Sequence, residues 1–174
     1  RAGKLSGGMK QKLALCCALI HRPAVLFLDE PTTGVDTVSR KEFWEMLKRL
    51  KSQGITILVS TPYMDEAMLC ERIALIQNGK IMSINTPEKI IAQYPKKLFA
   101  IKSQNMSHLL QDIRQFEGID SCNSFGDYHH ISFQYDDSEL QKKLIEYLDS
   151  KSHRNIEFVP VRPTIEDCFI ELMN

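Results

Sequence analysis

Two adjacent carboxylates at the end of an apolar run are the residues of this sequence best suited to catalysis. In AVLFLDEP, residues 24–31, Asp29 and Glu30 follow five apolar residues and precede Pro31. An aspartate can hold a hard cation such as Mg²⁺, directly or through water, and a glutamate can orient and polarise a water molecule. Taken alone, such a segment is more often a solvated acidic turn after a core strand, so the catalytic interpretation needs a second motif.

A second motif, KLSGGMKQKLAL at residues 4–15, has the residues of a phosphate-binding helix start. Ser6 suits the N-cap position, and Gly7 and Gly8 in the first turn each cost about 1 kcal/mol of helix stability relative to Ala. Such a cost is useful where a ligand must approach the backbone, because free N–H groups and the positive end of the helix dipole attract phosphate. A glycine-containing turn before an ordinary helix explains this stretch equally well.

The hydrophobic pattern predicts the elements that hold these residues. A helix is expected over about residues 7–21, ended by Pro23. Its apolar positions are Met9, Leu13, Cys16, Cys17 and Ile20. The continuous apolar run before Asp29 indicates a strand buried on both faces of a parallel sheet. Pro31 cannot continue that strand, so both carboxylates lie at its carboxyl end, where open α/β sheets bind ligands.

Taken together, LSGGMKQ at residues 5–11 and LFLDEPTTGVD at residues 26–36 resemble the ATP-binding cassette family, the nucleotide-binding subunits of ABC transporters. In that family the signature motif of one subunit caps the ATP held by the other subunit. The resemblance implies ATP-binding roles for Leu5, Ser6, Gly7, Gly8 and Gln11. It also implies that Asp29 holds Mg²⁺ through water, that Glu30 is the catalytic base, and that Asp36 lies in the D-loop at the dimer seam.

The segment ILVSTPYMDEA, residues 57–67, departs from the family pattern. The family usually has a histidine after the Ser-Thr pair that ends this strand, and its side chain contacts the γ-phosphate. Pro62 occupies that switch position here, and proline offers neither a donor nor a titratable group. Pro62 is either a turn residue only or the mark of a slowed or asymmetric site. Because Asp29 and Glu30 are both kept, we expect reduced rather than absent hydrolysis.

The phosphate-binding loop G-x-x-x-x-G-K-[ST], which the family carries upstream of the signature, has no match in this sequence. The pairs Gly3-Lys4 and Gly79-Lys80 lack both the partner glycine and the hydroxyl residue. We therefore expect the C-terminal portion of a larger cassette protein, and we expect the isolated chain to bind ATP weakly and to be inactive. The tail RPTIEDCFIELMN resembles the ending of cassette subunits of the ABC-2 export type.

Two domains are expected, with a boundary near residues 93–97. Residues 1–94 are assigned to the C-terminal part of an ABC nucleotide-binding domain, an α/β fold with a partial P-loop NTPase (RecA-like) core of parallel strands. Residues 95–174 are assigned to a small α+β domain, whose strand-helix-strand-strand-helix-strand order matches the ferredoxin-like motif, followed by a helix starting near Pro163 or Thr164.

Within residues 1–94, four further features are expected after the acidic segment. They are an amphipathic helix over 36–54 that buries Phe43, Leu47 and Leu50, a buried strand over 55–60, a hairpin turning at Asn78-Gly79, and a helix starting at Thr86 and Pro87.

Composition favours an intracellular globular protein. The 22 basic and 22 acidic residues balance, so nothing argues for nucleic acid as a partner. No apolar run is long enough to span a bilayer, and no signal peptide is visible. The five cysteines form no C-x-x-C pair and are expected to be reduced, mostly buried thiols rather than a metal site. For His129 and His130 we expect an exposed strand pair, with metal binding as the alternative.

Two functions follow from the resemblance. The first is a Mg²⁺-dependent ATPase subunit at the cytoplasmic face of the membrane, which pairs with a second nucleotide-binding subunit, identical or different, and powers export through a separate transmembrane permease. The second is a nucleotide-responsive regulatory protein of the same fold with little hydrolysis. Asp29 and Glu30 support the first function, and Pro62 supports the second.

Overall fold

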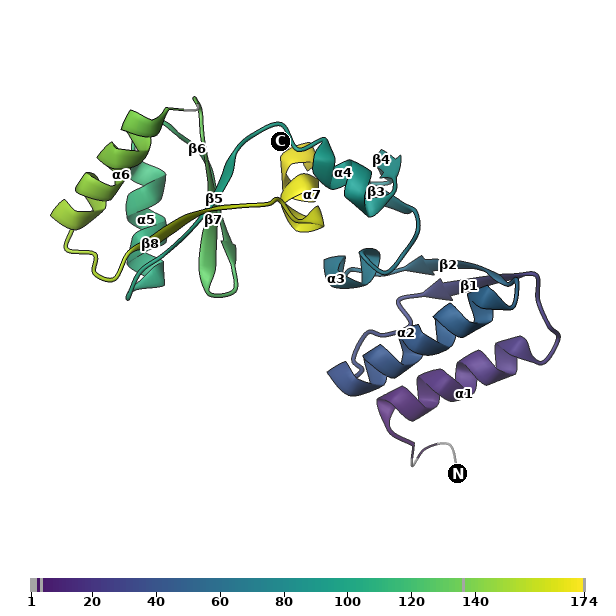
Figure 1. Cartoon of the computed structure of the whole chain (residues 1–174). Helices are drawn as coiled ribbons and strands as arrows, with labels where there is room; N and C mark the ends of the chain where they lie inside the picture. Colours follow the sequence, from purple (N-terminus) through teal and green to yellow (C-terminus); the bar gives the residue numbers. More distant parts are fainter. Residues whose placement is uncertain (1–2, 4, 136, 174) are drawn as a thin grey trace. The chain divides into compact units, whose positions relative to one another are not determined.

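The computed structural model describes residues 3, 5–135 and 137–173, which form two compact units, Arg1–Pro87 and Glu88–Asn174 (Figure 1). The division lies earlier in the chain than the predicted domain boundary at 94/95, because the helix that begins at Pro87 packs within the second unit. Ile90 of that helix is buried, and its carbonyl oxygen lies 3.7 Å from Sγ of Cys168. The assignment of the two parts to cassette and accessory domains stays a prediction.

The first unit combines two long helices with a parallel strand pair and a hairpin (Figure 1). Its elements are α1 (Gly7–Leu19), β1 (Val25–Asp29), α2 (Thr37–Ser52), β2 (Thr56–Ser60), α3 (Met64–Ala67), β3 (Ile73–Gln77) and β4 (Lys80–Asn85). Strands β1 and β2 are parallel, with Asp29 opposite Ser60. The β3–β4 hairpin confirms the predicted turn, because Asn78 and Gly79 have the positive φ angles, 50° and 73°, that a type I′ turn requires.

The core of the first unit lies between the helices and one face of the strand pair, and its buried members are Leu15, Leu26, Phe43, Trp44 and Leu47. The predicted buried face of α2 is confirmed by Phe43 and Leu47. The helix predicted from apolar spacing near residues 7–21 is present as α1, but the five apolar positions that indicated it are exposed, and α1 packs through Leu15 instead. Apolar residues occur on several sides of α1, so their spacing alone does not select the side that packs. The helix also ends at Leu19 rather than near residue 21.

The prediction that β1 is buried on both faces is wrong, and β2, which was predicted to be buried, is also exposed on one face. In β1 and β2, Leu26 is buried, whereas Phe27 and Leu58 are 72% and 61% exposed. Figure 1 shows the cause: α1 and α2 lie against the same side of the strand pair, and the described residues of this unit place no helix on the other side. An apolar run reports the hydrophobicity of both faces, but each face needs its own covering element to be buried.

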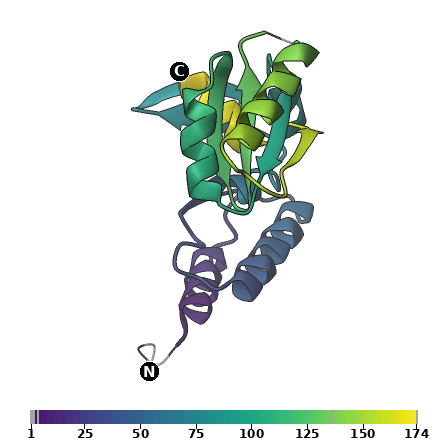
Figure 2. The same ribbon diagram turned by 90° about the vertical axis from the view of Figure 1, so that its left-hand side faces the viewer.

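The second unit is built on a four-stranded antiparallel sheet in the order β6-β7-β5-β8. Its elements are α4 (Pro87–Ala92), β5 (Leu98–Lys102), α5 (Met106–Gln115), β6 (Ile119–Phe125), β7 (Tyr128–Phe133), α6 (Ser138–Ser150), β8 (Glu157–Val161) and α7 (Ile165–Met173). Helices α5 and α6 lie side by side over one face (Figure 2). The core beneath them includes the fully buried Ile101, Leu109, Ile113, Ile131, Leu144 and Leu148. The order of elements is the one expected for residues 98–161, and the ferredoxin-like assignment stays a prediction.

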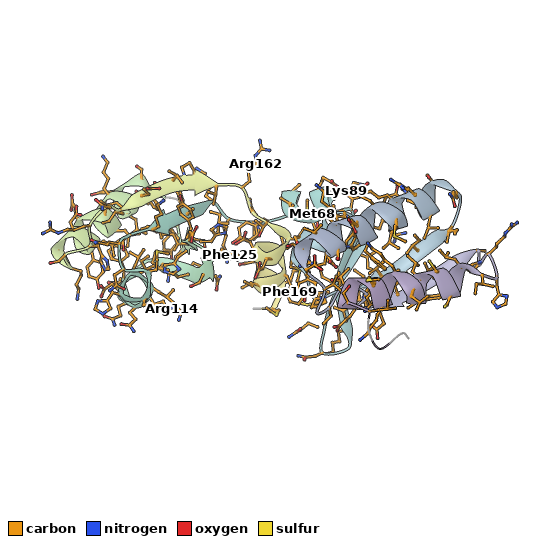
Figure 3. The ribbon with its side chains drawn as sticks, turned by 90° about the horizontal axis from the view of Figure 1, so that it is seen from below. Met68, Lys89, Arg114, Phe125, Arg162 and Phe169 are labelled. Carbon is orange, nitrogen blue, oxygen red and sulfur yellow. The ribbon has the colours of Figure 1, made fainter. Side chains whose placement is uncertain are left out.

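The central strand β7 corrects the expectation of an exposed histidine pair. His129 is buried and hydrogen-bonds through Nε2 to the carbonyl oxygen of Met106 at 2.8 Å. His130 points to the opposite face, where Nδ1 lies 2.9 Å from Oδ1 of Asp167 in α7 and the ring stacks on Phe125 with 4.4 Å between ring centroids. Phe125, the last residue of β6, is labelled in Figure 3. Because β7 is an inner strand with helices on both faces, successive residues both meet packed neighbours.

The burial of the cysteines differs from the prediction. All five are free thiols, and only Cys122 and Cys168 are buried, whereas Cys70 is half-buried and Cys16 and Cys17 lie exposed on α1. The prediction of mostly buried thiols is therefore wrong, because Cys16 and Cys17 lie on sides of α1 that no other element covers within the described residues.

Candidate functional site

The carboxyl ends of β1 and β2 bring the first predicted site residues together. Asp29 ends β1, and its carboxylate accepts a hydrogen bond from the hydroxyl of Ser60, the residue opposite it at the end of β2. The backbone N–H of Glu30 donates to both the carbonyl oxygen and the Oγ of Ser60, at 3.0 and 3.2 Å. These bonds fix the direction in which the chain leaves the sheet.

Glu30 lies at a strained point of the backbone. Its φ angle is 43°, in the left-handed region that non-glycine residues seldom adopt. Its carboxylate accepts a hydrogen bond from the Thr33 hydroxyl at 3.1 Å, and its carbonyl oxygen accepts one from the Thr33 N–H at 3.2 Å. The tight turn leaves the Glu30 side chain exposed at the carboxyl end of the strands, where it is accessible to water. Strain of this kind clusters at functional sites.

The start of α1 is capped as the sequence indicates. The Ser6 Oγ accepts a hydrogen bond from the Met9 N–H at 3.3 Å, and the Ser6 carbonyl oxygen accepts one from the Lys10 N–H at 3.0 Å. Gly7 is exposed, so the first turn presents backbone to solvent there. Leu5 and Gln11 are half-buried.

Gly8 has a role that the sequence did not reveal. It is buried against α2, and a Cβ added to it would lie 2.6 Å from Cβ of Ser39. At Gly7 the nearest atom to an added Cβ is the carbonyl oxygen of Gly34, at 3.3 Å. Both glycines therefore allow α1 to approach the loop and helix that follow Glu30. The close approach to phosphate that the sequence suggested remains a prediction for the exposed backbone at Gly7.

Asp36 is the N-cap of α2 in this structure. Its carboxylate accepts a hydrogen bond from the Ser39 N–H at 2.9 Å, and this bond, the largest influence, lowers the pKa of Asp36. Ser39 thus contacts both Gly8 and Asp36, so the structure brings the start of α1 and the Asp36 loop together. An ion pair between Lys12 and Glu42 also joins α1 to α2.

Pro62 lies exposed just beyond the end of β2, at the same edge of the strand pair as Asp29. The residues on either side of Pro62 are held in place. The Thr61 Oγ1 accepts a hydrogen bond from the Tyr63 N–H at 3.2 Å, and the Arg40 guanidinium stacks over the Tyr63 ring at 4.1 Å. The predicted switch position therefore lies at the candidate site and lacks a side chain that could bind phosphate.

Sequence reasoning missed Glu66 in α3. It is 2% exposed, and its carboxylate accepts hydrogen bonds from Thr32, Thr61 and Arg40 at 2.7, 2.7 and 3.0 Å. Burial by itself raises the pKa of Glu66, but the nearby side chains of Thr61, Thr32, Trp44 and Arg40 outweigh it and leave the pKa below its ordinary value. An acidic residue in a short segment after a strand gave no signal that it is buried.

The side chains present fit a magnesium ion bound mainly through water. The Asp29 carboxylate and the Ser60 hydroxyl are exposed oxygen ligands, and Mg²⁺ usually takes one or two protein oxygens and keeps several waters or phosphate oxygens. Within the described residues, no three His, Cys, Asp or Glu side chains form a protein-only metal cluster. No described helix has the length and apolar character needed to cross a membrane.

Comparison with known proteins relates this site to one class. Residues 1–33 match the family model described as ABC transporter. The matched residues include the start of α1 and the Asp29-Glu30 pair. This part of the chain is therefore similar in sequence to ABC transporter proteins.

Two relatives share this similarity over about half of the chain. The probable multidrug ABC transporter ATP-binding protein YbhF of Escherichia coli is 49% identical over 86 residues, which are 49% of this chain and 15% of that protein. The Nod factor export ATP-binding protein I of Burkholderia orbicola is 46% identical over 92 residues, 52% of this chain and 30% of that protein. The solved ATP-binding cassette MJ1267 has a TM-score of 0.48 and 28% identity, covering 51% of this chain and 36% of that chain. The matched region thus spans less than a third of YbhF and of the Nod factor export protein.

Proposed function

We propose that this chain is part of the ATP-binding and ATP-hydrolysing subunit of an ABC transporter that powers export through a separate membrane permease. The observation that carries the proposal is the position of Glu30. Its exposed carboxylate lies at the carboxyl end of a parallel strand pair, one residue after Asp29 and beside the loop that contacts the start of α1. Chemistry at that edge is typical of open α/β sheets.

The residues divide the reaction among them in this proposal. Asp29 holds the magnesium ion through water, which supplies charge stabilisation at the phosphates when it is bound. Glu30 orients the attacking water and accepts its proton. Ser6 and the backbone N–H of Gly7 face the γ-phosphate of ATP held by a second subunit, where the helix dipole favours negative charge. Leu5, Gly8 and Gln11 support that helix start.

Asp36 lies at the seam between the two subunits in this proposal. It already caps α2 beside Gly8, so one loop links the helix start to the seam.

The wider assembly follows the same proposal. The first unit is the C-terminal part of a P-loop NTPase core, and the second unit is a small ferredoxin-like domain, as in ABC-2 export systems. The exposed apolar side chains of Phe27 and Leu58 support a larger core, because an uncovered strand face of this kind is costly in water. The partners are a second nucleotide-binding subunit and a permease, at the cytoplasmic face of the membrane.

One observation favours the second candidate function, a nucleotide-responsive regulatory protein of the same fold with little hydrolysis. Pro62 offers no side-chain donor at the switch position. We favour hydrolysis because Glu30 is exposed and held in a defined turn.

The test is Glu30→Gln in the full-length protein that contains this chain. We expect turnover to be abolished while ATP affinity stays unchanged, since the amide keeps the shape of the carboxylate but cannot accept a proton. The matched control is Glu45→Gln. Glu45 is exposed on α2 and pairs only with Lys48 among the described ion pairs, so its replacement should leave turnover at the wild-type level. Near-normal hydrolysis in Glu30→Gln would show that Glu30 is not the base.

A second measurement tests how much of the ATP-binding site lies within this chain. Residues 1–174 alone should bind MgATP weakly or not at all, because the phosphate-binding loop supplies most direct contacts in the family. Isothermal titration calorimetry measures this directly, and micromolar affinity of the isolated chain contradicts it.

A further inference from the structure

Glu66 is a buried carboxylate with donors from three separate segments of the first unit. Thr32 and Thr61 each donate a hydroxyl hydrogen bond, one to each carboxylate oxygen, both at 2.7 Å. The Arg40 guanidinium donates to the oxygen that Thr32 also contacts, at 3.0 Å. With 2% of its surface exposed, Glu66 has little solvent to replace any of these donors.

Each donor lies next to a residue of the candidate site. Thr32 follows Glu30 by two positions in the strained turn, and Thr61 directly precedes Pro62. Arg40 lies near the start of α2, and its backbone N–H donates a hydrogen bond to the carbonyl oxygen of Asp36 at 2.9 Å. Glu66 therefore ties the three segments to a single carboxylate.

These bonds are stiff for a physical reason. Hydrogen bonds to an ionised acceptor are shorter and stronger than neutral ones, and a low local dielectric strengthens them further. Thr32 and Thr61 are β-branched, so each hydroxyl follows its own backbone closely. A displacement of one turn would break a bond, and because Glu66 is 2% exposed, bulk water has little access to replace it.

We propose that Glu66 is a positioning residue for hydrolysis, which holds the Glu30 turn and the Pro62 turn in fixed relation through Thr32 and Thr61. The inference rests on the proposed function. It deepens that function because Pro62 has no side chain to bind phosphate, so the position of its segment must be set by neighbours. The competing explanation is a buried ion pair that serves stability alone.

The experiment uses three near-isosteric variants of the full-length protein: Glu66→Gln, Thr32→Val and Thr61→Val. Glu66→Gln keeps the shape but removes the charge, and each valine removes one donor. We expect turnover per folded molecule to fall by about tenfold or more, with ATP affinity within about twofold of wild type, because misplaced groups affect the transition state more than ground-state binding. The matched control is Asp65→Asn. The Asp65 carboxylate is 76% exposed and contacts Arg40 at 3.3 Å, but it bonds to neither threonine. The turnover of this variant stays at the wild-type level.

A second readout separates positioning from stability. Thr32→Val and Thr61→Val should each slow turnover in the wild-type background and have little further effect in the Glu66→Gln background, because all three act through one carboxylate. If Glu66 serves stability alone, the variants lower the melting temperature but leave turnover per folded molecule unchanged. That result overturns the inference. Should Glu66→Gln fail to fold, the two valine variants decide by the same criterion.

The wild-type protein tests the proposed function in the same assay. If it binds ATP without hydrolysing it, the proposed function fails, and the positioning role fails with it. If wild type hydrolyses ATP and the Glu66 and threonine variants match it, the inference alone is overturned.

Discussion

Gly8 of α1 faces Ser39 of α2 with no room for a side chain between them. A Cβ built on Gly8 would lie 2.6 Å from Cβ and 2.7 Å from Oγ of Ser39, closer than side-chain atoms pack. Ser39 also donates its N–H to Asp36, so this contact joins the start of α1 to the cap of α2. Close packing of two helices explains Gly8 without reference to any ligand.

Gly8→Ala should destabilise the full-length protein by about 1–3 kcal/mol, the usual cost of overpacking, even though alanine favours a helix by about 1 kcal/mol. Equilibrium unfolding in urea measures the change in free energy. In the Ser39→Gly background the same substitution should cost much less, since the clashing atoms are gone. An equal cost in both backgrounds would place the effect elsewhere.

Pro62→His should raise the turnover of the full-length protein. A positioned histidine that contacts the γ-phosphate acts mainly in the transition state, so kcat should rise more than ATP affinity. The ceiling is roughly 10²–10⁴-fold, the usual range for such a group. Adaptation of the turn to the fixed φ of proline lowers the gain.

The measurement is kcat and ATP affinity for the wild-type and Pro62→His proteins, side by side. Unchanged kcat in a folded Pro62→His protein means that another group already fixes the attacking water. Pro62 is then a turn residue only.

Asp167 in α7 should make the stability of the second unit fall in acid. Burial raises the pKa of Asp167, but hydrogen bonds from His130 and Thr164 outweigh it and leave the pKa below the ordinary value of 3.8. A carboxylate with a lowered folded-state pKa contributes stability that is complete above about pH 4, where the unfolded group ionises, and is lost as pH falls through the lower folded pKa.

The free energy of unfolding, measured in urea from pH 6 down to pH 2, should therefore fall less steeply below pH 4 in Asp167→Asn than in wild type. Asp127→Asn, a change at an exposed turn, is the control and should keep the wild-type slope. Identical slopes in Asp167→Asn and wild type would exclude this contribution.

Local features of the fold were predictable because they depend on residues close in the chain. The Asn78-Gly79 turn, the start of α4 at Pro87 and the buried face of α2 each follow from backbone preferences or from a regular apolar spacing. Asp29 and Glu30 were identified for a similar reason, since a run of sequence puts both at the end of one strand.

The sequence by itself determined the types of the candidate site residues and their order along the chain. Only the tertiary structure decided which side of α1 is buried, that one face of β1 and β2 is exposed, and that Gly8 meets Ser39. It alone revealed Glu66, whose donors Thr32 and Arg40 lie 34 and 26 residues away. Burial and hydrogen bonding of this kind depend on which segments contact each other in the folded chain, and the local spacing of residues does not determine those contacts.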